Sequence, residues 1–208
     1  MIELHTWGTP NGRKISIMLE ECGLPYNVHK VDISKGEQFS PAFLRISPNN
    51  RIPAIVDPDG PGGKPISLFE SGAILIYLAD KTKKFMPADA AKRYDALQWL
   101  MWQMGGFGPM LGQAHHFLRA APTKIEYGMK RYVDEAKRLY GVLDKQLASN
   151  AFVAGEEYTI ADMSIFPWAA RHEWHTVNLA DFPNVKRWYD IVNARPAVTK
   201  GMAVPYLN

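Results

Sequence analysis

A short polar run at residues 9–12, Thr-Pro-Asn-Gly, is the segment of this chain best placed to do chemistry. It separates an apolar stretch that predicts a strand, residues 2–7, from a helical pattern over residues 11–22. Thr9 can cap this helix, and Pro10 suits its first position. Because a helix N-terminus presents unpaired N–H groups and the positive end of the helix dipole, the junction predicts a site for an anion or a thiolate.

The junction contains no cysteine, which limits the sulfur chemistry that the chain itself can supply. The single cysteine, Cys22, falls at the far end of the predicted helix, on the order of 15–20 Å from its start. We interpret it as a small core residue rather than a nucleophile. Thr9 offers a hydroxyl and Asn11 an amide, so a sulfur at this site must arrive with a ligand. A bound thiol such as glutathione is the simplest hypothesis.

Composition narrows the class of protein. The 208 residues carry a net charge of only +3, and the basic residues are dispersed, so no nucleic-acid partner is expected. No apolar run is long enough to span a bilayer, and the first residues do not resemble a signal peptide. Because one cysteine cannot form an internal disulfide, a reducing compartment is favoured. We therefore expect a cytoplasmic protein without a membrane partner.

The first eighty residues alternate strand and helix patterns. Strand patterns cover residues 2–7, 26–33, 53–56 and 66–68, and helix patterns cover residues 11–22, 40–46 and 70–79. One crossover unit followed by a hairpin predicts a small mixed sheet. Residues 1–80 are therefore predicted to form one α/β domain.

The rest of the chain shows helix patterns and no convincing strand. Residues 80–88 resemble a linker, and residues 89–208 are predicted to form an all-helical domain. Thr159 and Asp162 match a capping box at the start of one helix. Helices are expected over residues 90–119, with a bend near residues 105–109, and over residues 124–147, 183–194 and 197–203.

The pair Ile52-Pro53 stands just before the third predicted strand. A cis bond here would turn the backbone N–H and C=O of Ile52 outward, where they could pair with an extended peptide. The alternative is an ordinary trans proline at the start of an edge strand. Only about 5–6% of X-Pro bonds are cis, but the order of the surrounding elements favours cis at this position.

The pair Glu70-Ser71 opens the third predicted helix. The Ser71 hydroxyl and the neighbouring N–H groups could bind a carboxylate, and Glu70 could hold an ammonium group. Together they would suit the free amino-acid end of a γ-glutamyl group. The alternative is that Ser71 only caps the helix and Glu70 only complements its dipole.

Four features together resemble a cytosolic glutathione transferase: the hydroxyl residue after the first strand and the segments at residues 50–55, 68–74 and 158–163. Further segments at residues 9–12, 36–39, 47–50 and 102–110 resemble the bacterial nu class. Members of that class are glutathione-dependent disulfide-bond oxidoreductases with weak conjugating activity. The resemblance covers essentially the whole chain. It implies a thioredoxin-like domain of order βαβαββα followed by an all-α domain.

The resemblance also implies site residues and partners. Thr9 and Asn11 match the catalytic residues near the glutathione sulfur, and Arg131 matches an arginine of the helical domain that reaches a glutathione carboxylate. The remaining tripeptide contacts match Gln38, Ile52, Pro53, Glu70 and Ser71. Glutathione would be a cosubstrate, bound as a reduced pair or as glutathione disulfide, in a homodimer. No metal is expected, since His172 and His175 have no evident third ligand.

Three functions remain open at this point. The favoured one is a glutathione-dependent disulfide-bond oxidoreductase that uses bound glutathione rather than a protein cysteine, acting on small disulfides. Organic hydroperoxides and electrophiles would be further substrates. The alternatives are a conventional transferase that conjugates electrophiles and a non-catalytic glutathione-binding regulator. Because no tyrosine precedes Tyr26, the sequence argues against the tyrosine-activated thiol of some transferase classes.

Overall fold

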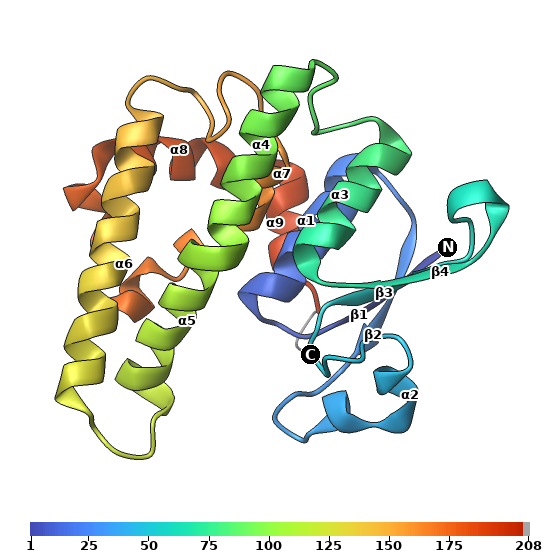
Figure 1. Ribbon diagram of the computed structural model, residues 1–208, viewed down its shortest axis with the longest axis horizontal. Coiled ribbons are helices and arrows are strands. Elements are labelled where there is room, and N and C mark those ends of the chain that lie inside the picture. The colour runs from blue at the N-terminus through green and yellow to red at the C-terminus, as the bar shows by residue number, and fades with distance from the viewer. Residues whose placement is uncertain (206–208) are drawn as a thin grey trace. The chain divides into compact units, whose positions relative to one another are not determined.

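The computed structural model describes residues 1–205, which divide into two compact units (Figure 1). One unit contains Met1–Lys84 and residues 195–205, and the other contains Phe85–Ala194. Residues 206–208, the end of the predicted helical domain, lie outside the described residues. Among the described residues, no helix combines the length and the apolar character needed to cross a membrane.

A four-stranded mixed sheet forms the centre of the first unit. Its strands are β1 (Ile2–Thr6), β2 (Tyr26–Lys30), β3 (Ala54–Asp57) and β4 (Ile66–Phe69). They lie in the order β2-β1-β3-β4, with β1 parallel to β2 and antiparallel to β3, and β3 antiparallel to β4. The mixed sheet predicted from one crossover unit and one hairpin is therefore confirmed.

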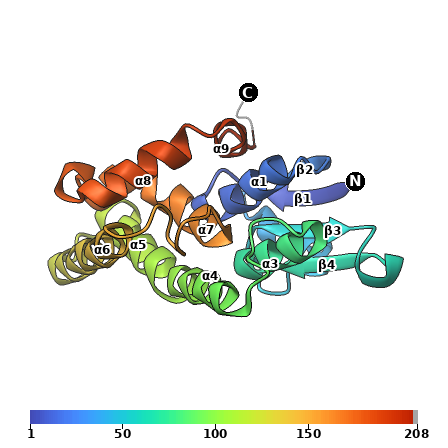
Figure 2. The same ribbon diagram turned by 90° about the horizontal axis from the view of Figure 1, so that it is seen from above.

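Helix α1 (Pro10–Cys22) begins and ends where its sequence predicts. The Thr9 side chain accepts a hydrogen bond from the Gly12 N–H at 3.3 Å, and Gly23 ends the helix in the left-handed conformation with φ 67°. α1 packs against α3 (Ser71–Thr82) on one side and against α9 (Pro196–Met202) on the other, as Figure 2 shows. The short helix α2 (Pro41–Leu44) follows a 3₁₀ turn at Glu37–Phe39.

The position of α9 differs from the sequence-based division of the chain, which assigned residues 197–203 to the helical domain. α9 belongs to the first unit because Gly201 lies directly against α1: a Cβ on Gly201 would stand 2.5 Å from the Ile17 Cα. The Ser16 hydroxyl donates to the Gly201 carbonyl at 2.6 Å, and Arg195 forms a bidentate pair with Glu21 at 2.6 and 2.8 Å. Periodicity predicts that this helix exists but not which helix it contacts.

The second unit is helical. The predicted long helix is interrupted by a π-helical turn at Gln103–Phe107, which separates α4 (Ala90–Trp102) from α5 (Gly108–His115), and a second such turn covers His116–Ala120. A π-helical turn inserts one extra residue into a helix, so the chain stays helical through each of these turns. The remaining helices of the unit are α6 (Glu126–Leu147), α7 (Ile160–Ala169) and α8 (Pro183–Asn193).

The capping box predicted at Thr159 and Asp162 is confirmed, and it extends further than the sequence indicates. The buried Asp162 carboxylate accepts hydrogen bonds from the Thr159 N–H at 2.9 Å and from the Thr159 hydroxyl at 3.2 Å. Its other oxygen accepts from the Val153 N–H at 2.9 Å and from the Trp188 indole at 2.8 Å. One carboxylate thus joins the start of α7 to α8 and to the loop before α7.

We predict that Asp162→Asn destabilises the protein by about 2–4 kcal/mol, because the new NH₂ group faces a buried donor whichever oxygen it replaces. Urea unfolding followed by circular dichroism measures the difference. Asp190→Asn is the matched control, since Asp190 is exposed and pairs with Lys186 in the neighbouring turn; its effect should stay within about 0.5 kcal/mol. Equal effects of the two substitutions would contradict the assignment.

Candidate active site

The sheet register brings three of the predicted segments to one edge. His5 pairs with Ala54, and Ala54 pairs with Phe69. Thr9 follows shortly after the end of β1, Pro53 directly precedes Ala54, and Ser71 comes two residues after Phe69. The start of α1, the Ile52-Pro53 bond and the start of α3 therefore lie at the same edge of the sheet, which is the one where β1 and β4 end and β3 begins.

The junction between β1 and α1 is tight. A Cβ on Gly12 would lie 2.3 Å from the Thr6 hydroxyl oxygen and 2.5 Å from the Trp7 carbonyl oxygen, so this position accepts only glycine. The half-buried Thr9 uses its hydroxyl oxygen to accept the Gly12 N–H, which leaves the hydroxyl hydrogen for another acceptor. Asn11 occupies the first turn of α1, where backbone N–H groups have no helical partner.

The Ile52-Pro53 bond is cis, as the order of the elements favours. The side chain of Ile52 packs against a buried cluster formed by Val31, Phe43 and Ala54, which holds the loop in place. The hydrogen bonds found among the described residues leave the backbone N–H and C=O of Ile52 unused. Both groups can therefore serve an extended peptide, as the sequence suggested.

The structure shows that one interpretation of the start of α3, with Ser71 as the helix cap, is wrong. Ser71 does not cap the helix; the N-cap residue is Glu70, whose side chain makes no capping bond, and Ser71 is the first helical residue. The Ser71 hydroxyl instead accepts a hydrogen bond from the Lys14 ammonium at 3.3 Å, and both side chains are buried. Exposed Glu70 has φ 68°, a conformation rare outside glycine that tends to occur at functional sites.

Lys14 was not identified from the sequence. It is 1% exposed and lies on α1 one turn after Asn11. Burial lowers the pKa of its ammonium to about 7, against the opposing effect of the nearby Glu70 charge. The sequence carries little signal for its burial, because Lys14 follows the charged Arg13 and only directly precedes the apolar residues that begin at Ile15.

The two site residues that came from the resemblance alone lie in different units. Gln38 belongs to the 3₁₀ turn before α2 and is buried, and its side-chain oxygen has no hydrogen-bond partner among the described residues. A buried acceptor without a partner is costly, so it fits a position where a ligand donates. Arg131 is exposed on α6 in the helical unit, and its contact with glutathione stays a prediction.

Cys22 lies at the opposite end of α1 from Thr9. Its sulfur contacts the Thr82 hydroxyl at 3.5 Å and the Met18 sulfur at 3.9 Å, and burial raises the pKa of the thiol. A raised pKa keeps the group as the less reactive thiol. Among the described residues, no group of three or more His, Cys, Asp or Glu side chains could hold a metal ion.

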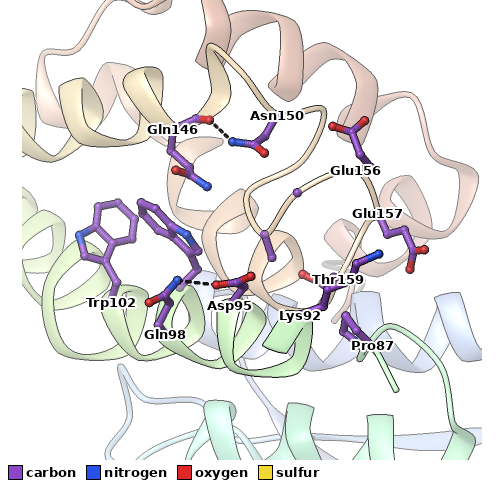
Figure 3. A pocket seen from close by; sticks show the side chains of 13 residues that line it. Pro87, Lys92, Asp95, Gln98, Trp102, Gln146, Asn150, Glu156, Glu157 and Thr159 are labelled. Atoms are coloured by element: carbon purple, nitrogen blue, oxygen red, sulfur yellow. Dashed lines mark hydrogen bonds between the residues drawn. The ribbon is translucent and has the colours of Figure 1, made fainter. Parts of the chain in front are cut away.

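A pocket of about 730 Å³ opens within the helical unit, with Trp102 at one end and Glu156 and Glu157 at the other (Figure 3). Trp99 and Trp102 meet edge to face, with ring centroids 5.1 Å apart. None of the predicted glutathione-site residues lines this pocket. Its lining therefore contributes nothing to the proposed contacts with the tripeptide.

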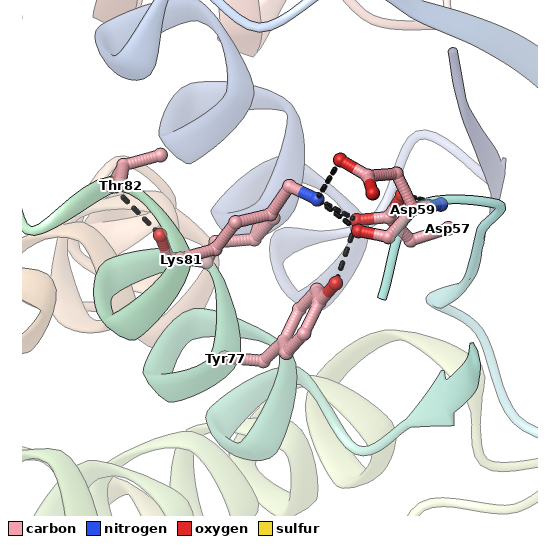
Figure 4. A network of polar contacts seen from close by, with 6 residues as sticks. Asp57, Asp59, Tyr77, Lys81 and Thr82 are labelled. Atoms are coloured by element: carbon pink, nitrogen blue, oxygen red, sulfur yellow. Dashed lines mark hydrogen bonds and ion pairs between the residues drawn. The ribbon is translucent and has the colours of Figure 1, made fainter. Parts of the chain in front are cut away.

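A polar network attaches the end of β3 to α3, within the unit that carries the start of α3 (Figure 4). The Tyr77 hydroxyl donates to the buried Asp57 carboxylate at 2.6 Å, and the Lys81 ammonium pairs with the same carboxylate at 3.0 Å. Burial raises the pKa of Asp57, but the bonds from Tyr77, the Asp59 N–H and Lys81 outweigh it, so the pKa is lowered overall. The ionised carboxylate therefore holds α3 against the sheet.

Two family descriptions match the chain: the N-terminal domain of glutathione S-transferase at residues 9–81 and its C-terminal domain at residues 109–196. The chain belongs to the glutathione S-transferase family. This confirms the family resemblance and the thioredoxin-like fold followed by a helical domain.

Individual relatives within the glutathione S-transferase family cover nearly the whole chain. The disulfide-bond oxidoreductase YfcG of Escherichia coli K12 is 51% identical over 203 residues, which are 97% of this chain and 94% of that protein. A Burkholderia graminis glutathione transferase, solved with two glutathione molecules per subunit, has a TM-score of 0.94 at 48% identity and covers 100% of this chain and 89% of its own. A Pseudomonas putida transferase, solved with one glutathione disulfide per subunit, has the same score and identity, over 98% of this chain and 91% of its own.

We predict that Tyr77→Phe lowers the free energy of unfolding by about 1–2 kcal/mol at pH 7, because it removes a hydrogen bond to a carboxylate. The lowered pKa of Asp57 means that its contribution is present above the unfolded-state value of about 3.9 and is lost as the pH falls through the folded-state value. The difference in the free energy of unfolding between the wild type and Tyr77→Phe should therefore be smaller at pH 3 than at pH 7. Urea unfolding at both pH values tests this, with the exposed Tyr94→Phe as a control that should change nothing.

We predict that iodoacetamide alkylates Cys22 at least about tenfold more slowly in the folded protein than in guanidinium, because the thiol is half-buried and its pKa is raised. Mass spectrometry at pH 7.5 follows the reaction. Equal rates in the two conditions would mean that the sulfur is accessible and ionised, which the contacts with Thr82 and Met18 do not allow.

Proposed function

We propose that this chain is a glutathione-dependent disulfide-bond oxidoreductase that takes its reactive sulfur from bound glutathione. The observation that carries the proposal is a helix N-terminus of the thioredoxin-like unit that has Thr9 and Asn11 but no cysteine. Two further facts support it: the 51% identity to a protein named as a disulfide-bond oxidoreductase, and relatives solved with two glutathiones or one glutathione disulfide per subunit.

The reaction needs no protein sulfur. A free thiol of pKa about 8.5 is mostly protonated at neutral pH, so the site must favour the thiolate. Thr9 and Asn11 would donate hydrogen bonds to it, and the positive end of α1 adds to their effect. The thiolate attacks one sulfur of a small disulfide and releases the other half as a thiolate, which takes up a proton. A second glutathione thiolate then attacks the glutathione sulfur of the mixed disulfide, giving glutathione disulfide and the second thiol.

The rest of the tripeptide would be held at the sheet edge. The backbone of Ile52, before the cis Pro53, pairs with the cysteinyl residue. Ser71 and the first N–H groups of α3 take the γ-glutamyl carboxylate, and Glu70 takes its ammonium group. Gln38 would accept from the ligand with its buried oxygen, and Arg131 would reach a glutathione carboxylate.

The remaining expectations are parts of the same proposal. We expect organic hydroperoxides to be reduced and electrophiles to be conjugated weakly, because the same thiolate would attack either. We also expect a cytoplasmic homodimer, on family grounds.

One comparison distinguishes the reductase from the conventional transferase and the binding-only regulator. It sets glutathione-dependent turnover of 2-hydroxyethyl disulfide against conjugation of 1-chloro-2,4-dinitrobenzene. Faster conjugation would favour the conventional transferase, and neither activity would favour a binding-only regulator. Cys22→Ser should retain the reductase rate.

We predict that Asn11→Ala lowers disulfide-reductase turnover about 10- to 150-fold and more than Thr9→Ala does. The side-chain amide of Asn11 has two N–H donors where the Thr9 hydroxyl has one, and a lost hydrogen bond to a charged group costs roughly 1.5–3 kcal/mol. Glutathione affinity should fall less than turnover, because Ile52, Glu70 and Ser71 still hold the tripeptide. Steady-state kinetics and calorimetry measure both effects. Unchanged turnover in both variants would remove the side-chain role and leave only backbone N–H groups near the sulfur.

A further inference from the structure

The pocket of about 730 Å³ in the helical unit has two chemically different ends. It lies between α4, the end of α6 and the loop before α7 (Figure 3). The indoles of Trp99 and Trp102 line one end, and Glu156 and Glu157 stand at the other. Pockets that bind small molecules have volumes of about 300–1,000 Å³, so this pocket is large enough for such a ligand. The contrast between its ends restricts the chemistry of an occupant.

The aromatic end is built on one face of α4. Asp95, Trp99 and Trp102 follow one another at spacings of four and three residues, which places them on the same side of the helix. The two indoles meet at an interplanar angle of 72°, so they form a corner rather than a flat wall. Trp102 also stacks on the buried Phe107 at 5.1 Å, which fixes its ring. This corner suits an aromatic ring, because aromatic pairs favour edge-to-face and offset arrangements.

The charged lining residues make the pocket negative. The carboxylates among the described lining residues are Asp95, Glu156 and Glu157, and the only cation among them is Lys92. None of these four side chains belongs to an ion pair within residues 1–205. The Asp95 carboxylate accepts a hydrogen bond from the neutral Gln98 amide at 3.0 Å, which leaves its charge in place. Three negative charges against one positive charge favour a cationic ligand over an anionic one.

The carboxylates alone would not indicate a site, since exposed glutamates are common on protein surfaces. This position differs because the carboxylates face the same hollow as two indoles that are held at an angle to each other. An indole face attracts a cation, so the aromatic and the acidic lining favour the same sign of charge. The pocket therefore combines a place for an apolar body with a place for a positive group.

We propose that this pocket binds a small arylalkyl ammonium ion, with its ring in the corner of Trp99 and Trp102 and its ammonium group at Glu156 and Glu157. The site is distinct from the one proposed for glutathione, because none of the predicted glutathione-site residues lines it. The inference therefore does not depend on the proposed function.

Three ligands of similar shape and different charge test this proposal: 2-phenylethylamine, the neutral 2-phenylethanol and the anionic phenylacetate. NMR at pH 7 follows the indole N–H signals of the six tryptophans, and spectra of Trp99→Leu and Trp102→Leu assign the two signals of the pocket. The amine should shift these two signals saturably. The alcohol should bind about two- to tenfold more weakly, and phenylacetate more weakly still. Raising the ionic strength from about 0.01 M to about 0.15 M should weaken binding of the amine, because salt screens the carboxylates.

Charge substitutions at exposed positions test the acidic end. Glu156→Gln/Glu157→Gln should weaken binding of 2-phenylethylamine by about two- to tenfold and leave binding of 2-phenylethanol unchanged, because the change removes charge and keeps shape. Lys92→Gln should act in the opposite direction and strengthen binding of the amine. Glu126→Gln/Glu173→Gln is the matched control, since both residues are exposed in the same unit and neither lines the pocket; it should behave as wild type.

Saturable shifts of the Trp99 and Trp102 signals by the amine, weakened in Glu156→Gln/Glu157→Gln and retained in the control, support the inference. Three results overturn it: no shift of either signal, equal binding of the amine and the alcohol, and amine binding that is unchanged in Glu156→Gln/Glu157→Gln. Circular dichroism checks the folding of each variant. The glutamate variant keeps the test decisive even if a tryptophan variant fails to fold, because both glutamates are exposed.

Discussion

The pairing of His5 with Ala54, and of Ala54 with Phe69, decides where the proposed site can form. These two pairs align the ends of three chain segments that are far apart in the sequence. Because side chains alternate between the two faces of a strand, a shift of one residue in either pair would move Pro53 or Ser71 relative to the start of α1 and turn the neighbouring side chains to the other face. The register therefore matters more to the site than any single side chain in it.

The tight junction after β1 has a chemical consequence. Gly12 allows α1 to start directly against Thr6 and Trp7, so the first N–H groups of the helix face the edge of the sheet. A protein cysteine at such a position would be activated by the helix dipole. Here the same dipole would act on a ligand, and the protein would contribute orientation and donors while the cosubstrate contributes the sulfur. This arrangement agrees with relatives that hold two glutathiones per subunit, since both sulfurs of the exchange are then supplied by ligands.

The helix starts of this fold could be predicted, because they depend on residues that are close together in the sequence. Thr9 and the Thr159–Asp162 box were recognisable because capping depends on a few residues and the nearest backbone groups. Contacts between segments that are far apart in the sequence could not be predicted in this way. The location of α9 depends on the absence of a side chain at Gly201 opposite Ile17, and no periodicity records such a contact.

The start of α3 shows the same limit at a functional position. A serine after a strand reads as a helix cap, yet the backbone places Glu70 at the cap with a positive φ and leaves the Ser71 hydroxyl to Lys14. The sequence contains Lys14, but only the packing of α1 on α3 shows that its ammonium is buried. Burial of this kind depends on two helices that meet only in the folded chain, so neither segment taken alone indicates that the Lys14 ammonium reaches the Ser71 hydroxyl at 3.3 Å.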